Sequence, residues 1–266
     1  MIKLENTVLP SAEQWEAIIR GMRNPKNSWN RSDSHSCGTC GDCDNCIDYD
    51  NCPYDYDFLK LVIGPNDHDL MMRLAKGGPV HAKYRRMIPV YVDITAPLYW
   101  WKEFDTYKVG TVANSCSTMH KIHAKEFVME DFSTDRLLDL EKRQLRETIA
   151  VLNAERDNFL NDGNKVWWDQ MIQLLPSSYN QKRTIFLTYE VLHNIYHSRR
   201  NHKLKEWHEV CAWIESLPYS EIITLKGEPI EKTEDSSIIA KTVNLSYEDA
   251  SEALKSPTLI FEKEGE

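Results

Sequence analysis

The sequence has little in the way of long hydrophobic segments, and its first residues lack the pattern of a secretory leader. No apolar run approaches the roughly 20 residues that a membrane-spanning helix requires. The first residues, MIKLENTVLPSAEQWEA, contain no basic region followed by an apolar stretch, which is the pattern of a secretory signal. We therefore expect a soluble, cytoplasmic protein with no membrane partner.

Positive charge is also scarce. The 266 residues include 32 Lys and Arg against 41 Asp and Glu, which gives a formal charge of -9 at neutral pH. This balance disfavours non-specific binding to duplex nucleic acid, because such binding depends on many contacts between cationic side chains and phosphates. Hydrophobic residues make up 41% of the chain, enough for one sizeable core. We expect one main domain.

Cysteine is nearly absent outside one short segment. Five of the seven cysteines crowd into residues 37–52, a spacing that favours a metal site over a disulfide framework. The pattern is Cys37-x-x-Cys40-x-x-Cys43-x-x-Cys46, followed by Cys52-Pro53. Four thiolates at this spacing suit tetrahedral zinc, whereas the final Cys-Pro is typical of iron-sulfur proteins, whose spacing before the last cysteine is shorter. Zinc is our hypothesis, and an iron-sulfur cluster or a metal-free reduced loop are the alternatives.

The hydrophobic pattern predicts an α+β fold in which a central mixed or antiparallel sheet packs against long helices. Apolar residues alternate from Ile88 to Thr95 and predict a strand, in which Pro89 favours a sheet edge or a strand start. Helical signals occur at 11–23, 65–74, 98–104, 133–160, 182–199 and 204–217. In segment 133–160, the expected buried residues are Leu137, Leu138, Leu140, Leu145, Ile149, Val151, Leu152 and Phe159.

Composition divides the chain into three segments. Residues 1–57 contain the first helix and a polar, Cys-rich insertion, and residues 58–225 contain the apolar periodic segments of a core. Residues 226–266 mix charge with Ser and Thr, so we expect a weakly ordered tail with at most a hairpin.

Several short motifs occur in a characteristic order. An apolar strand and Pro97 lead into Lys102-Glu103-Phe104 and then into Thr106-Tyr107-Lys108. Asn114 and Ser117 follow, and farther along Leu175-Pro176 precedes a helix that carries Asn194 and Arg199. In this order the chain resembles the flavin-dependent thymidylate synthases, from about Pro65 to Leu217. That family has Arg-Gln-Trp, Arg-His-Arg and Ser-x-Asn-Glu-x-Ser-x-Arg in the corresponding upstream places.

The resemblance implies roles for individual residues. Arg199 would engage the pyrimidine, Asn194 would help to hold the flavin, and Ser117 would contact the nucleotide, with Arg199 and Ser117 as the catalytic candidates. The other implied cofactor contacts are Tyr107, Lys108 and His81, and the other implied substrate contacts are Asn114, Lys182 and Arg183. Structural alternatives exist for three of these places: a solvated helix end at Arg199, a helix N-cap at Ser117 and a solvated helix start at 182–183.

The chain departs from the family where positive charge is expected. Thr106 and Met119 carry no charge, Tyr107 offers only a hydroxyl, and Ile172 stands where an arginine would precede Leu-Pro. Phosphate affinity must therefore come from elsewhere, and Lys182-Arg183 is the nearest substitute.

The resemblance implies a homotetramer that carries out FAD-dependent reductive methylation of dUMP, or of a related deoxypyrimidine nucleotide. Methylenetetrahydrofolate and NADPH would be the co-substrates. The alternative is a non-catalytic nucleotide-binding or assembly protein on the same scaffold, with the Cys-rich segment as a zinc-binding interaction loop.

Overall fold

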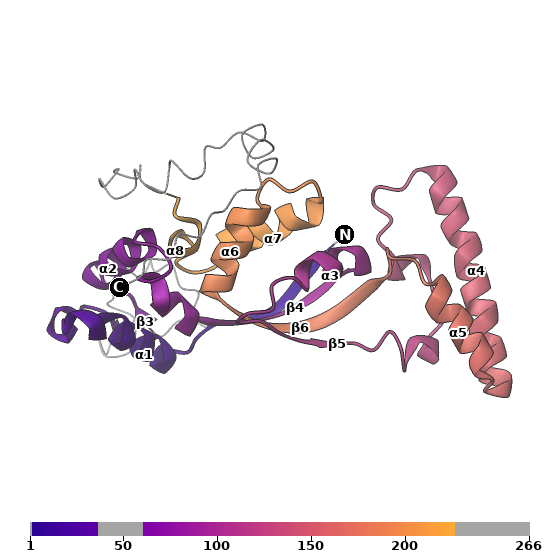
Figure 1. Ribbon diagram of the computed structural model, residues 1–266, viewed down its shortest axis with the longest axis horizontal. Coiled ribbons are helices and arrows are strands. Elements are labelled where there is room, and N and C mark those ends of the chain that lie inside the picture. Colours follow the sequence, from indigo (N-terminus) through magenta and orange to yellow (C-terminus); the bar gives the residue numbers. More distant parts are fainter. Residues whose placement is uncertain (1, 37–60, 227–266) are drawn as a thin grey trace, which may run out of the picture. The chain divides into compact units, whose positions relative to one another are not determined.

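A four-stranded antiparallel sheet forms the centre of the computed structural model, which describes residues 2–36 and 61–226 (Figure 1). The strand order is β1-β4-β6-β5. The four strands are β1 (Lys3–Val8), β4 (Pro89–Pro97), β6 (Asn180–Thr188) and β5 (Val112–Ser115). Two further short strands, β2 (His35–Ser36) and β3 (Leu61–Val62), pair with each other. The antiparallel form of the predicted α+β fold is thus confirmed.

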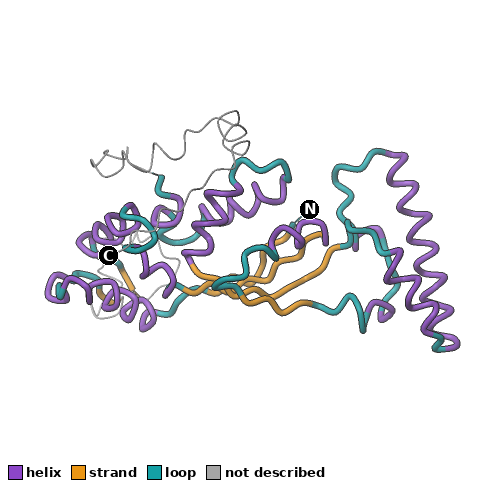
Figure 2. Tube along the Cα trace, in the orientation of Figure 1, coloured by secondary structure: helices purple, strands orange, loops and turns teal. Residues whose placement is uncertain are grey.

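The helices lie over one face of the sheet and beyond its two ends (Figure 2). They are α1 (Ala12–Arg23), α2 (Pro65–Lys76), α3 (Leu98–Phe104), α4 (Asp139–Asp162), α5 (Lys165–Leu174), α6 (Tyr189–Arg199), α7 (Lys205–Glu215) and α8 (Glu221–Thr224). Of these, α4 and α5 pack against each other in a separate cluster. Short 3-10 turns connect several elements: η1 (Asn24–Lys26), η2 (Trp29–Arg31), η5 (Ala82–Met87), η6 (Ile122–Ala124) and η7 (Met129–Asp131).

The two faces of the sheet differ because side chains alternate along each strand. On β4, Val90, Val92 and Ile94 are buried against the helices, whereas Tyr91 is 47% exposed on the opposite face. Pro89 is the first residue of β4, and β4 lies between β1 and β6. The prediction of a strand start at Pro89 is confirmed, and that of a sheet edge is wrong.

The largest side chains buried in the main core are tryptophans. Trp100 and Trp101 on α3 both pack with Phe104, and Trp100 also packs with Trp207 on α7, with 4.8 Å between the two ring centres. Trp15 of α1 joins the same core. Because these rings come from three separate parts of the chain, they fix α1, α3 and α7 against the sheet.

The helix predicted at 133–160 starts later than expected. The backbone at Phe132 pairs with Tyr179, and the Ser133 N–H donates to the Ser178 carbonyl (2.8 Å), so this stretch is extended and cannot begin a helix. The helix α4 begins at Asp139 instead. Its buried residues are Leu145, Ile149 and Leu152, whereas Leu138 (75%), Leu140 (64%) and Val151 (46%) of the predicted set are exposed.

The helix predicted at 182–199 is a strand followed by a helix. Residues 180–188 form β6, which pairs with β4 on one side and with β5 on the other. Only 189–199 is helical, and the Thr188 side chain caps that helix by accepting from the Val191 N–H. Pairing with two neighbouring strands therefore overrides the local helical signal at 182–188.

A buried ion pair holds the segment that follows α1. Arg23 Nε donates to Asp67 Oδ1 at 2.5 Å, and the two side chains are 3% and 0% exposed. Asp67 Oδ2 also accepts hydrogen bonds from Ser32 Oγ (2.8 Å) and from the amide and hydroxyl of Ser34. The Asp33 N–H is a fifth donor to this carboxylate (3.1 Å), and the five hydrogen bonds tie residues 32–34 to α2.

Among the helices that the structure describes, none combines the length and apolar character needed to cross a bilayer. The tail predicted at 226–266 and the boundary predicted at 57/58 lie outside the described residues apart from Lys226, so these domain assignments stay predictions.

Candidate functional site

Arg199, at the carboxyl end of α6, packs against α3 and α7. Its Nε atom donates to the Tyr107 hydroxyl (2.9 Å) and its Nη1 atom to Oε2 of Glu103 (3.0 Å). Only 19% of the Arg199 side chain is exposed. The alternative of a solvated helix end is therefore wrong for Arg199, and two predicted site residues, Arg199 and Tyr107, are in direct contact.

Glu103 connects this group of residues, which we call the Glu103 cluster: Glu103, Tyr107, Arg199, His202 and Trp207. Its Oε2 atom accepts from Arg199 and from the Trp207 indole N–H (3.0 Å), and it lies 3.3 Å from His202 Nε2. The Arg199 guanidinium carbon lies 4.9 Å from the Trp207 ring centre and 5.6 Å from that of Tyr107. The charge and the two rings together hold the guanidinium in one orientation.

Arg183 lies on the same, helix-covered face of the sheet. Its guanidinium carbon is 4.1 Å from the Trp101 ring centre, and Nη1 donates to Asp105 Oδ1 (2.7 Å). Gln181 accepts from Arg183 Nε (2.9 Å). Arg183 is thus a compensated, half-buried cation, and the alternative of a solvated helix start is wrong because residue 183 belongs to β6.

Lys182 points to the opposite face, as strand alternation requires. Its ammonium group pairs with Asp93 Oδ2 (2.9 Å), and Asp93 also accepts from Thr184 Oγ1 (2.6 Å). Hydrogen bonds from Thr184 and Lys182 hold the pKa of Asp93 well below its usual value. Lys182 and Arg183 therefore cannot serve one pocket together, which corrects the prediction of a joint phosphate contact.

A cleft of about 610 Å³ opens beside Lys182. Its lining includes Lys3, Thr95, Cys116, Lys125, Asp131, Tyr179 and Lys182. Within it, Lys125 pairs with Asp131. The positive charges of Lys125 and Lys182 are therefore both compensated in place.

Asn114 and Ser117 lie at the β5 end of the sheet and are exposed. Asn114 pairs across from Thr184 on β6, so it shares the open face with Asp93 and not the face that carries Arg199. The Ser117 hydroxyl accepts from the His120 N–H (2.8 Å) in a turn that does not start an α-helix. The structure thus does not bring these two residues to Arg199, and the helix N-cap alternative for Ser117 is wrong.

The other predicted cofactor contacts lie apart from the Glu103 cluster. Asn194 is an exposed residue on α6, and Lys108 is exposed in the turn after α3. His81 is exposed between α2 and η5, where its amide donates to the Gly78 carbonyl (3.0 Å).

A second polar cluster next to the Glu103 cluster has no counterpart in the sequence predictions. The Tyr99 hydroxyl and Arg136 both donate to the Glu206 carboxylate, whose residue is 1% exposed. Burial and the hydrogen bond to Glu206 raise the pKa of Tyr99 to about 12. Arg136 and Tyr99 lie 70 and 107 positions from Glu206 in the chain, so no local pattern signals them. Glu103, in contrast, stands inside the turn that the motif order indicates.

Within residues 2–36 and 61–226, no three His, Cys, Asp or Glu side chains meet as a metal site. The predicted metal ligands Cys37, Cys40, Cys43, Cys46 and Cys52 lie outside the described residues.

No protein-family model matches the sequence, and no curated protein matches it. Solved structures do match. Thymidylate synthase X from Helicobacter pylori with FAD and dUMP shares 15% identity at a TM-score of 0.53, over 85% of this chain and 96% of that chain. A second structure of that flavin-dependent enzyme, also with FAD and dUMP, shares 13% identity at a TM-score of 0.50, over 85% of this chain and 97% of that chain. A UMP/dUMP methylase, PolB from Streptomyces cacaoi, bound with 5-Br dUMP shares 13% identity at a TM-score of 0.52, over 85% of this chain and 94% of that chain. The chain therefore has the fold of these proteins, as the motif order predicts.

Proposed function

We propose that this chain is a flavin-dependent methylase that acts on dUMP or a related deoxypyrimidine nucleotide. Methylenetetrahydrofolate would supply the carbon and NADPH would reduce the flavin. Similar folds bound to FAD and dUMP support the nucleotide and cofactor classes. The observation in this chain that carries the proposal is the oriented guanidinium of Arg199 in the Glu103 cluster.

The residues suit the uncharged parts of FAD better than its two phosphates. Arg199, Arg183 and Lys182 are each paired with a carboxylate, so their charge is already compensated. Of the predicted contacts, Lys108 has no ion pair among the described residues, and the Asn194 amide is exposed. One uncompensated cation does not match a diphosphate, so binding of the phosphates needs a further source of positive charge.

The role that we assign to residues of this chain is to stabilise negative charge on the substrate. Negative charge develops on the pyrimidine ring as C5 becomes nucleophilic, and fixed cationic donors stabilise such charge. Arg199 Nη2 makes no hydrogen bond within the described part of the chain, while Nε and Nη1 fix the group in place. We assign Nη2 as the donor to the pyrimidine. A bound flavin would supply the hydride for reduction of the transferred carbon.

The second candidate is a non-catalytic nucleotide-binding or assembly protein. It is favoured by one specific observation, the ion pair between Glu103 and Arg199, which compensates the guanidinium that catalysis would use. The zinc-binding interaction loop at residues 37–52 belongs to this candidate and stays a hypothesis.

Titration with FAD separates the two candidates. For the methylase, we expect purified protein to take up one FAD per chain, with the visible absorbance of the bound flavin shifted from that of free flavin. Asn194→Ala should weaken this uptake, while Asn153→Ala, at the hydrogen bond between α4 and residue 127, serves as a distant amide control. Absence of any uptake by the wild-type protein would reject the methylase and leave the binding protein.

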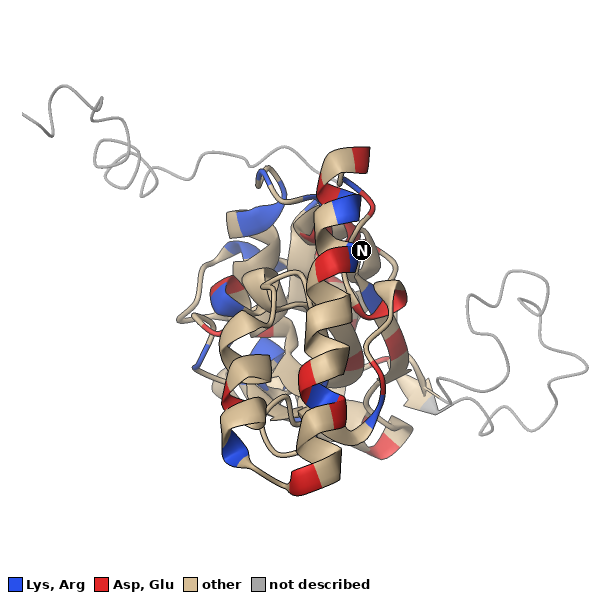
Figure 3. Cartoon of the chain, turned by 90° about the vertical axis from the view of Figure 1, so that its right-hand side faces the viewer, with Lys and Arg blue, Asp and Glu red and all other residues tan. Residues whose placement is uncertain are grey.

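We also infer that copies of this chain associate, as the predicted homotetramer requires. In Figure 3, α4 and α5 face the viewer, and charged residues of both signs lie among uncharged stretches on them. Exposed apolar residues occur on both helices: Leu140 (64%), Val151 (46%), Leu160 (53%), Val166 (52%) and Leu174 (43%). Apolar surface of this kind is typical of protein contacts.

Sedimentation velocity tests the association. The wild-type protein is expected to sediment as a tetramer, and Val151→Lys together with Val166→Lys should shift it to smaller species at the same concentration. Val80→Lys, at an exposed valine outside α4 and α5, is the control and should change nothing. A wild-type protein that sediments as a monomer at all concentrations contradicts this inference.

A further inference from the structure

Two cavities lie beside α1, η1 and η2. The first has a volume of about 290 Å³ and the second about 740 Å³. Arg23 lines both of them. None of the residues of the Glu103 cluster or of the open sheet face lines either cavity, so they are separate from the candidate site described above.

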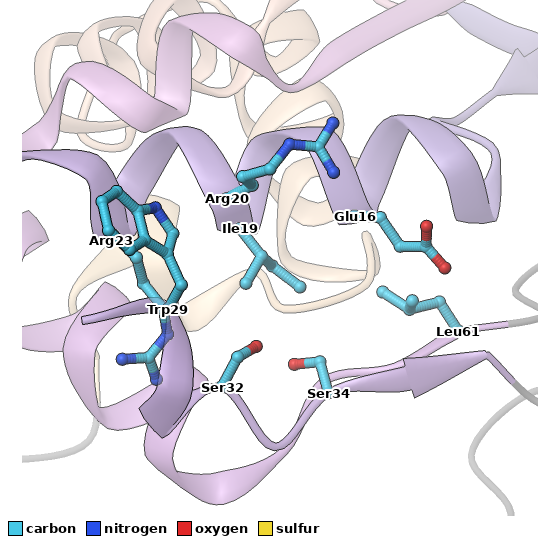
Figure 4. A pocket seen from close by; sticks show the side chains of 8 residues that line it. All are labelled: Glu16, Ile19, Arg20, Arg23, Trp29, Ser32, Ser34 and Leu61. Carbon is cyan, nitrogen blue, oxygen red and sulfur yellow. The ribbon is translucent and has the colours of Figure 1, made fainter. Parts of the chain in front are cut away.

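The first cavity offers an apolar and aromatic lining. Ile19, Leu61 and Trp29 line it, and Figure 4 shows Trp29 and Leu61 towards its two ends, with the hydroxyl groups of Ser32 and Ser34 along one wall. The Trp29 side chain is 50% exposed, yet its indole N–H donates to Asn24 Oδ1 (2.8 Å), which fixes the ring. A fixed, exposed indole is a surface on which another planar ring stacks.

The second cavity carries uncompensated positive charge. Four cationic side chains line it, and two of these are paired: Arg23 with Asp67, and Arg73 with Asp69 at 2.9 Å. The other two, Lys26 and Arg31, have no ion pair among the described residues. Two free cations match a phosphate monoester, which carries about -1.5 to -2 at neutral pH. This charge is unusual for a chain with a net charge of -9.

Hydrogen bonds from Arg23 hold the loop that carries these cations. The Nη1 and Nη2 atoms of buried Arg23 donate to the carbonyl groups of Ser28 (3.1 Å) and Arg31 (3.0 Å). The amino-terminal end of α2 contributes nothing to anion binding, because Asp33 already accepts from the amides of Asn66 and Asp67. Lys26 and Arg31 are therefore the anion-binding groups, on a backbone that is already ordered.

We propose that the two cavities form one binding site for a mononucleotide, with the base stacked on Trp29 and the phosphate between Lys26 and Arg31. Trp29 lines the first cavity, Lys26 and Arg31 line the second, and Arg23 lines both, so one small molecule that spans the two would place a ring on Trp29 and a phosphate beside the two cations. Stacking on an indole accepts any base, so the site selects for a nucleotide rather than for one base.

Isothermal titration calorimetry of the full-length protein with AMP, adenosine and inorganic phosphate tests the site. AMP should bind, and adenosine and phosphate should each bind at least about tenfold more weakly, because each makes only half of the contacts. Raising the salt concentration should weaken AMP binding and leave adenosine nearly unchanged. If phosphate binds as tightly as AMP, the site holds an anion only and the proposal is wrong.

Variants locate the binding. Lys26→Gln together with Arg31→Gln should lower AMP affinity about tenfold or more, and Trp29→Ala should do so by a similar factor. The matched control is Arg143→Gln with Arg146→Gln, which removes the same charge from exposed positions on α4. AMP binding that is equal in the Lys26/Arg31 variant and in this control places the nucleotide elsewhere and overturns the proposal.

Discussion

Replacing Arg199 with Lys is expected to lower kcat/KM for nucleotide methylation by about 10²-fold or more while the protein stays folded. Lysine keeps the positive charge that Glu103 pairs with, but it lacks the planar guanidinium that donates to Tyr107 and Glu103 at the same time. Loss of Nη2 removes the donor that we assign to the pyrimidine. The measurement is the initial rate as a function of nucleotide concentration.

The neighbouring Arg200→Lys variant is the control, because Arg200 lies at the exposed end of α6 outside the Glu103 cluster. It should retain the wild-type rate. Thermal melting of both variants separates catalysis from folding. A fully active Arg199→Lys protein would show that the guanidinium is structural and would remove Arg199 from the site.

Replacing Asp67 with Ala is expected to lower the free energy of unfolding by about 3–5 kcal/mol. Arg23, which is 3% exposed, would keep its charge without a counter-charge, and the donors at Ser32 and Ser34 would lose their acceptor. Since small domains have only about 5–15 kcal/mol of stability, this loss brings the variant close to unfolding. Urea unfolding followed by fluorescence measures the change.

The exposed pair in the same helix provides the matched control. Asp69→Ala removes the partner of Arg73, but these side chains are 65% and 62% exposed, so the expected change is within about 0.5 kcal/mol. Equal midpoints for the two variants would contradict a structural role for the buried pair.

The pH dependence of stability has a defined sign at Asp67. Burial opposes ionisation, but hydrogen bonds from Ser34, Ser32 and Arg23 outweigh it and hold the pKa of Asp67 below its ordinary value. A carboxylate with a lowered folded-state pKa contributes stability at neutral pH that is lost as the pH falls below about 4. The Asp67→Ala variant should therefore differ from wild type at pH 7 more than at pH 3.

Local pattern predicts the elements whose burial follows one period. The strand at 89–97 and the helices α1, α2, α3 and α7 lie where alternation, caps and helical spacing place them. The pattern fails where partners decide the conformation. The local pattern predicts residues 182–188 to be helical, but they form a strand because β4 and β5 both pair with this segment.

The sequence predicts only part of the candidate site. Motif order leads to Arg199 and Tyr107, which are in contact, and to the turn that contains Glu103. It cannot indicate that Lys182 and Arg183 face opposite sides, because that follows from their place on a strand. It also gives no sign of Glu206, whose partners Tyr99 and Arg136 come from distant segments.

Release of tritium from C5-labelled nucleotide tests the proposed function most directly, since a carbon can be added at C5 only if the C5 hydrogen leaves. With FAD, methylenetetrahydrofolate and NADPH present, the wild-type protein is expected to release tritium from C5-labelled dUMP or from another C5-labelled deoxypyrimidine nucleotide. The Arg199→Lys variant should release it at least about 10²-fold more slowly. No release from any of these nucleotides by wild-type protein that has taken up FAD would contradict the methylase.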